Sequence, residues 1–249
     1  MNRLRRALGR QDWAAVSIEL IVVVLGILIA LQVDQWTQRR QERELEQTYL
    51  LRLKEDLQIE YSRATDAESW ARDRLTAVKA LNRLSSDPDR AASDPSAILW
   101  AIETASWRSF PRNNAFVYNE LENTGHMRLI RSVALRRQLA DHYAKLAIDA
   151  WVGEDRAAEE EFDHATAGLL TTEELIALEQ AAGDRRQVDV EPSRATALAA
   201  GFSKRADALA QLPSVAQHHL FNLRVIGDEK ARLRKLTAAV ASELRQKDK

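Results

Sequence analysis

Two side-chain patterns in this sequence have the residue types of a metal site. Glu161 and His164 form Glu-x-x-His, which carboxylate-bridged di-iron bundles use in two copies, but the sequence has no second copy. His218 and His219 are adjacent, so both cannot bind a metal from one face of a helix. We therefore expect no metal site, with one histidine of this pair on the surface and the other at its boundary. The acidic residues near Glu161 are expected to form a solvated face: Glu154, Asp155, Glu159 and Glu160.

Patterns for nucleophilic catalysis and nucleotide binding are also missing. Asp141 and His142 have the types of two catalytic-triad members, but no Gly-x-Ser-x-Gly elbow accompanies them. The sequence has no Walker loop and no other glycine-rich phosphate motif. It has no cysteine, which excludes disulfides, thiolate metal sites and cysteine catalysis. The sequence thus predicts a protein that is not an enzyme and has no cofactor.

Another carboxylate, Glu19, lies within the most apolar stretch of the chain. Residues 20–31, LIVVVLGILIAL, contain no polar side chain. A helix from Trp13 to Trp36, at about 1.5 Å per residue, is long enough to cross the hydrocarbon core of a bilayer. Trp at both ends is typical of the two membrane interfaces. Residues 13–36 are therefore predicted to form one transmembrane helix. The alternative is a buried core helix near the N-terminus, but helices of soluble proteins rarely lack a polar face over three turns.

A basic arm, residues 1–12, precedes this span. Its four arginines are Arg3, Arg5, Arg6 and Arg10, whereas the three arginines closely following the span are interleaved with glutamates. The positive-inside rule then predicts a cytosolic N-terminus and a C-terminal region outside. The absence of cysteine is compatible with a bacterial periplasm, and we expect a single-pass protein of the bacterial inner membrane with a periplasmic C-terminal region. A cleaved signal peptide would need an Ala-x-Ala-like site. Ala30-Leu31-Gln32 does not provide one, so we expect the span to remain as an anchor.

One face of the span combines a polar side chain with the two smallest ones. At 100° per residue, Glu19, Gly26 and Ala30 lie within about 40° of one another. Gly26-x-x-x-Ala30 is a small-xxx-small pair, which lets two helices approach closely. A carboxylate in a membrane is costly and suggests a functional site. We predict a helix–helix contact here, with a second copy or with another membrane subunit. Alternatively, Glu19 extends to the headgroups near Arg10 and Gly26 is incidental.

The remainder of the chain is predicted to be helical. Only 8 glycines and 5 prolines occur, and the net charge of −1 leaves no basic excess for nucleic acid. Apolar residues recur at three- and four-residue steps from Leu45 to Leu81, which indicates an amphipathic stalk helix over residues 37–84. Ser85–Pro95 is the first break. Residues 85–249 are expected to form an extramembrane antiparallel helical bundle, so the fold class is all-α.

Capping residues and breakers predict the helix boundaries within the bundle. The expected helices cover residues 95–107, 115–124, 133–164, 173–182, 192–212 and 214–246. The N-caps would be Asp94, Asn114, Ser132 and Thr171 or Thr172; the stops would be Gly125, Gly183 and Pro213. In the last helix Leu220, Leu223 and Ile226 are among the residues expected to face inward.

Two segments of the sequence resemble a known family. Residues 19–36, ELIVVVLGILIALQVDQW, precede a charged helix that contains YLLRLKEDL, Tyr49–Leu57. Residues 116–131, FVYNELENTGHMRLIR, form the second similar segment. Together they resemble a family of uncharacterised bacterial single-span membrane proteins with a domain of unknown function. The residues that match its span motif are Glu19, Gly26, Gln32 and Trp36. The resemblance implies a single span but brings no activity.

These patterns favour a membrane-anchored, non-enzymatic scaffold or interaction protein. Its periplasmic helical domain would bind an unidentified protein partner, and its span would mediate oligomerisation. The alternative is an accessory subunit of a proton- or ion-driven inner-membrane complex, with Glu19 as the titrating group.

Overall fold

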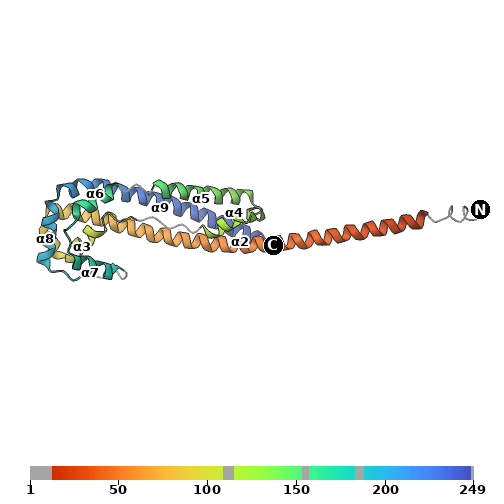
Figure 1. The fold of residues 1–249 in the computed structure, drawn as a ribbon, viewed down its shortest axis with the longest axis horizontal. Coiled ribbons are helices and arrows are strands. Elements are labelled where there is room, and N and C mark those ends of the chain that lie inside the picture. Colours follow the sequence, from red (N-terminus) through yellow and green to blue (C-terminus); the bar gives the residue numbers. More distant parts are fainter. Residues whose placement is uncertain (1–12, 109–114, 153–156, 183–187, 248–249) are drawn as a thin grey trace, which may run out of the picture.

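The computed structural model describes residues 13–108, 115–152, 157–182 and 188–247, without the side chains of 13–16, 146–152 and 246–247. Every regular element in these ranges is a helix, which confirms the predicted all-α class. Figure 1 shows one helix that extends far beyond a bundle of the others. In chain order the helices are α2 (Trp13–Ser86), η2 (Pro88–Ser93), α3 (Pro95–Thr104), α4 (Phe116–Asn123), η3 (His126–Leu129), α5 (Val133–Val152), α6 (Ala157–Thr166), α7 (Thr172–Ala182), α8 (Pro192–Ser203) and α9 (Ala206–Lys247).

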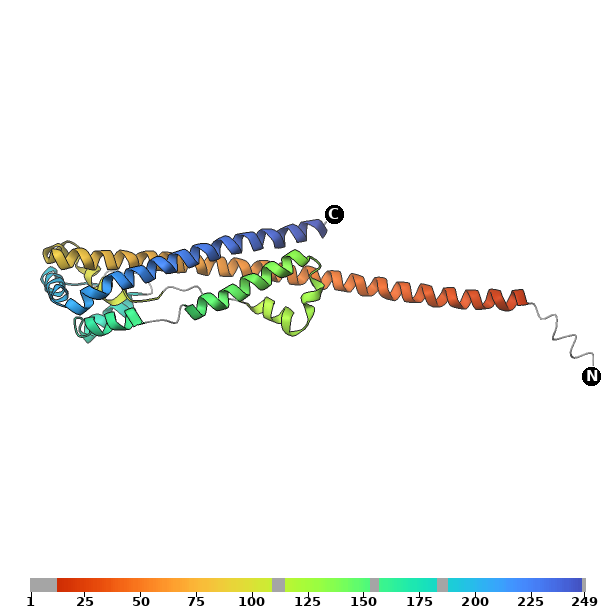
Figure 2. The ribbon, with the colours of Figure 1, turned by 90° about the horizontal axis from the view of Figure 1, so that it is seen from above.

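Helix α2 is continuous over 74 residues, so the predicted span and stalk are one helix. Its N-terminal part is long and apolar enough to cross a membrane, and 0% of this apolar window is buried within the chain. A core helix of a soluble bundle would be covered by its neighbours, whereas these side chains are bare. The exposed part of α2 projects out of the bundle in both views (Figures 1 and 2).

The second part of α2 is the first helix of the bundle. From Glu46 onwards one face is buried, with Leu50, Leu53 and Leu57 fully covered. This face packs most extensively against α9, which runs antiparallel to it (Figures 1 and 2). Burial of each leucine side chain contributes about 1.5–3 kcal/mol, so the apolar stripe seen in the sequence explains why the two helices associate.

The bundle contains two apolar cores along its length. The core nearer the projecting end combines residues of α2, α4, α5 and α9, including Tyr118 and Leu139. The distal core combines the end of α2 with η2, α3, α6, α7, α8 and the start of α9, including Phe162 and Phe202. Helices α3, α7 and α8 lie together at the end of the molecule away from the N-terminus (Figure 1).

Pro213 does not end a helix, and the predicted boundary there was wrong. Helix α8 ends at Ser203, and α9 begins at Ala206 and continues through Pro213. A proline inside a helix removes one backbone hydrogen bond. Leu212 and Val215 on either side are buried in the distal core, and this burial holds the helix together across the missing bond.

Leu220 does not face inward as predicted, since 56% of it is exposed. The buried positions on this part of α9 are Val215, His219, Asn222 and Ile226, which follow helical spacing. The inward face of α9 therefore includes two polar residues, His219 and Asn222, which apolar periodicity alone does not predict to be buried.

The predicted capping was confirmed at three sites. Ser132 Oγ accepts a hydrogen bond from Leu135 N (3.3 Å). Thr171 and Glu174 form a reciprocal capping box, with N–O distances of 3.2 and 2.8 Å. Gly125 has the left-handed φ of 70°. The predicted sites at Asn114 and Gly183 lie outside the described residues.

Helix α3 begins at Pro95, directly after Asp94, as predicted. The side chain of Asp94 makes no capping bond, however; its backbone carbonyl accepts a hydrogen bond from Ala97 N (3.1 Å) instead. Helix α3 ends at Thr104 rather than near Trp107. Of the expected helix over residues 133–164 the structure describes α5 and α6, and residues 153–156 between them lie outside the described residues. Local sequence preference did not reveal the end of α3, because contacts from distant helices hold residues 105–108 in place.

Candidate functional site

The predicted membrane face is open in the single chain. Glu19, Gly26 and Ala30 lie on the projecting part of α2 and are exposed. A Cβ atom added at Gly26 would meet nothing within 4 Å. Trp36, at the far end, is exposed, with the Arg40 guanidinium 6.0 Å from its ring centroid. The side chain of Trp13 and the arginines Arg3, Arg5, Arg6 and Arg10 lie outside the described residues. The helix–helix contact stays a prediction.

The Glu-x-x-His residues do not form a site. Glu161 and His164 on α6 are both exposed. In the described ranges no group of three or more His, Asp or Glu side chains is arranged to hold a metal ion. Among the buried polar groups of the described residues, two clusters contain a buried histidine, and one of these clusters borders a pocket.

The first cluster lies at the segment just after α3, residues 105–108. His219 on α9 has its Nε2 atom 2.6 Å from the carbonyl oxygen of Ala105. Because a carbonyl only accepts, Nε2 carries the proton, and burial lowers the pKa of His219 so that it stays neutral. Ser106 Oγ donates to Asp163 on α6 over 2.5 Å. The prediction of a surface and a boundary histidine was wrong, because His219 is 0% exposed.

Arg108 is fixed by two further interactions. Its carbonyl accepts a hydrogen bond from Arg74 Nη1 on α2 (2.6 Å). Its guanidinium lies 3.7 Å from Glu159 of α6, which is also 3.1 Å from His218 Nδ1. Glu159 is only 1% exposed, so its assignment to a solvated face was wrong; Glu160 is exposed as expected, and Glu154 and Asp155 lie outside the described residues. A buried carboxylate needs such partners, and here they come from α9 and from the residue after Trp107.

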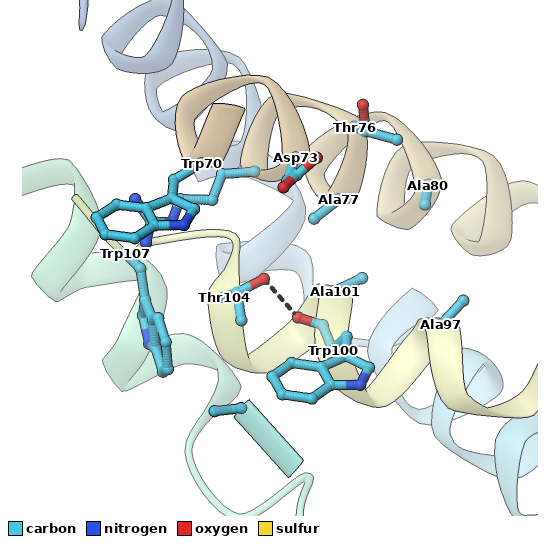
Figure 3. A pocket seen from close by; sticks show the side chains of 12 residues that line it. Trp70, Asp73, Thr76, Ala77, Ala80, Ala97, Trp100, Ala101, Thr104 and Trp107 are labelled. Carbon is cyan, nitrogen blue, oxygen red and sulfur yellow. Dashed lines mark hydrogen bonds between the residues drawn. The ribbon is translucent and has the colours of Figure 1, made fainter. Parts of the chain in front are cut away.

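These contacts position one wall of a pocket between α2 and α3. The pocket has a volume of about 590 Å³. Figure 3 shows the indoles of Trp70 and Trp107 toward one end of it and the indole of Trp100 on the α3 side. The alanines between the two helices lie toward the other end: Ala77, Ala80, Ala97 and Ala101 (Figure 3). Its size and its mostly apolar lining match those of small-molecule sites.

The polar residues that line this pocket include Arg74 and Asp73 on α2. Arg74 also lies over the ring of Trp107, with 5.9 Å from its guanidinium carbon to the ring centroid. Burial lowers the pKa of Arg74 to about 10. Neither Arg74 nor Trp70 belongs to a motif that points to a site. Their spacing was a usable signal, because Trp70, Arg74 and Ala77 are four and three residues apart and so share a helix face.

The second cluster of buried polar groups joins α5 to α2 in the core formed by α2, α4, α5 and α9. Glu60 Oε2 lies 3.0 Å from His142 Nε2, and Tyr143 OH donates to Glu60 Oε1 over 3.1 Å. The rings of Tyr143 and Tyr118 are stacked with centroids 4.3 Å apart. Burial, together with the charge of Glu60, raises the pKa of Tyr143, so the tyrosine stays a neutral donor. His142 therefore pairs across the bundle, while its neighbour Asp141 is exposed.

We expect Glu60→Ala to destabilise the bundle by roughly 3–5 kcal/mol, because it leaves His142 and Tyr143 without their buried acceptor. Chemical denaturation of the intact chain in lipid nanodiscs, followed by circular dichroism, measures this loss. Glu55→Ala is the matched control, since Glu55 is an exposed glutamate on the same helix. Equal midpoints for the two variants would show that the Glu60 contacts do not stabilise the fold.

In comparisons with known proteins, no family model, no curated protein and no solved structure matches this chain. The fold and the pocket define its class: a helical bundle that carries an interhelical pocket and continues into a bare apolar N-terminal helix. The resemblance to single-span bacterial membrane proteins stays a prediction.

Proposed function

We propose that this protein is a membrane-anchored, non-enzymatic scaffold, with its helical bundle in the bacterial periplasm. The observation that carries the proposal is the continuity of α2. One helix contains both an uncovered apolar segment and the buried central face of the bundle. No loop separates the two, so the orientation of the bundle follows the orientation of the span.

The connection between the two parts of α2 is short. The buried face begins at Glu46, whose Oε1 accepts a hydrogen bond from Arg131 N (2.8 Å). From Trp36 to Glu46 the helix rises about 15 Å. A bundle held this close to the bilayer by a helix is suited to presenting one surface to a membrane-bound partner. The proposed partner is a protein of the same membrane.

In this proposal the span also mediates oligomerisation. Glu19, Gly26 and Ala30 share one face, and the space beside Gly26 is open. Two such helices would approach closely at the small residues, and Glu19 would be hydrogen-bonded within the contact rather than exposed to lipid. Because α2 is continuous, the crossing of two spans would also set how two bundles face each other.

We expect Gly26→Ile to weaken the oligomer by roughly 5- to 30-fold, the equivalent of about 1–2 kcal/mol of contact energy. Sedimentation equilibrium in a mild detergent measures the change. The substitution leaves the single helix unstrained, since the added side chain meets open space. Leu28→Phe is the control, because residue 28 is about 180° from Glu19 on the helix. An unchanged oligomer in Gly26→Ile, or an equal loss in both variants, would contradict the contact.

The accessory-subunit alternative stays a prediction. It differs from the scaffold in its dependence on a titrating group. Glu19→Gln keeps the shape and the hydrogen-bonding capacity of the side chain but removes its charge, so a scaffold tolerates it and a proton-carrying subunit does not.

A further inference from the structure

The side chain of Arg74 lines the pocket between α2 and α3. Arg74 donates one hydrogen bond, to the carbonyl of Arg108, and lies over the ring of Trp107. Within the described part of the chain it forms no ion pair with a carboxylate. A half-buried charge without a counter-charge is unfavourable, and the depressed pKa of Arg74 reflects its partial desolvation. Asp73, its neighbour in sequence, offsets only part of this through its negative charge.

The uncharged walls indicate the shape of a ligand. Three indoles line the pocket, those of Trp70, Trp100 and Trp107, and Arg74 lies against Trp107. Aromatic rings favour flat apolar partners in offset or edge-on contact. The four alanines of the floor leave the space between α2 and α3 unfilled. An apolar body of drug-like size fits a volume of about 590 Å³.

The charges decide which head group such a ligand carries. The guanidinium excludes a quaternary ammonium ion, which three tryptophans alone would otherwise suit. Asp73 lines the same pocket and disfavours a dianion such as a phosphate monoester. A monocarboxylate satisfies both conditions, and its two oxygens match the planar donors of arginine.

We propose that this pocket binds a flat apolar monocarboxylate, with the carboxylate on Arg74 and the apolar body against Trp70, Trp100 and the alanines. The inference depends on the pocket and not on the span. If the pocket bound no carboxylate, the proposals of anchoring and oligomerisation would still stand. If those two proposals failed, the pocket could still bind its ligand.

The test is calorimetric titration of the full-length protein in lipid nanodiscs with 2-naphthoate, corrected for empty nanodiscs. We expect saturable binding that the neutral 2-naphthamide does not reproduce. Arg74→Met should weaken binding by roughly 10- to 100-fold, the range of a hydrogen bond to a charged group. Arg72→Met is the matched control, since Arg72 is on the same helix but pairs with Glu68 at the surface, and it should bind like the parent.

A second variant, Ala77→Leu, fills the pocket without changing its charge and should abolish binding. If circular dichroism shows that Arg74→Met does not fold, Ala77→Leu still tests the proposed binding. No saturable heat above that of empty nanodiscs would overturn the proposal. Equal binding of 2-naphthamide, tighter binding of 2-naphthyl phosphate, or unchanged binding in Ala77→Leu would overturn it too.

Discussion

A chain that begins at Thr37 is expected in the supernatant after lysis, whereas the intact chain remains with the membranes until detergent is added. Residues 20–31 contain ten Leu, Ile and Val side chains. At about 0.3–0.6 kcal/mol each, they favour insertion by about 3–6 kcal/mol in total. The truncation should not unfold the bundle, because the buried face of α2 begins only at Glu46. Sedimentation of membranes followed by immunoblotting, with circular dichroism of the truncated chain, checks both points.

A substitution in the full-length chain controls for the loss of residues. Val24→Arg and Leu28→Arg together raise the free energy of membrane insertion by about 5–7 kcal/mol at the centre of a span. This increase offsets the favourable contribution of the apolar residues. This variant should also leave the membrane fraction. Recovery of the intact chain in the supernatant without detergent would contradict the anchor and, with it, the proposed function.

The absence of natural cysteines makes the orientation easy to test. Asp207→Cys places one thiol on an exposed position at the start of α9. In intact cells a maleimide that crosses only the outer membrane should label this thiol. Asn2→Cys, in the basic arm, should react only after the cells are opened. The reverse pattern would place the bundle in the cytosol.

Leu53→Ala is expected to lower the free energy of unfolding of the bundle by about 2–5 kcal/mol. Leu53 is 0% exposed, in the core formed by α2, α4, α5 and α9. Its truncation removes apolar contacts and leaves a cavity that tightly packed neighbours cannot fill. For a chain of this size each kcal/mol lowers Tm by about 2–4 °C, so a decrease of about 4–20 °C should appear in thermal melts.

Leu51→Ala is the control for this experiment. Leu51 lies two residues earlier on the same helix and is 47% exposed, so its truncation removes far less buried surface. Its Tm should change by no more than a few degrees. If both variants melted together, α2 would not be packed against α9 through the face described above.

Much of the architecture was predictable because it depends on short-range pattern. Apolar spacing along residues 45–81 predicted the helix and the side that it buries. The residues of that stripe, such as Leu50 and Leu57, are fully covered. Ser132, Thr171 and Gly125 act within one helical turn, and these signals were interpreted correctly.

The polar core was not predictable in the same way. Glu60 and His142 are 82 residues apart in sequence, and His219 and Ala105 are 114 apart. A glutamate or histidine on a helix favours solvent unless a distant element supplies its partner, and no local pattern shows that partner. For the same reason the sequence analysis placed Glu159 on a solvated face and did not single out Arg74.

By itself, then, the sequence determined that this protein is helical, that its most apolar stretch is long enough to cross a bilayer, and which side chains share a face of that stretch. Only the tertiary structure decided that α9 continues through Pro213, that Glu60, Glu159 and His219 are buried, and that Trp70, Trp100 and Trp107 line one pocket with Arg74. The physical reason is the range of the interactions. Helix formation and capping depend on neighbours within a turn, whereas the burial of a charge or the opening of a pocket depends on which helices meet.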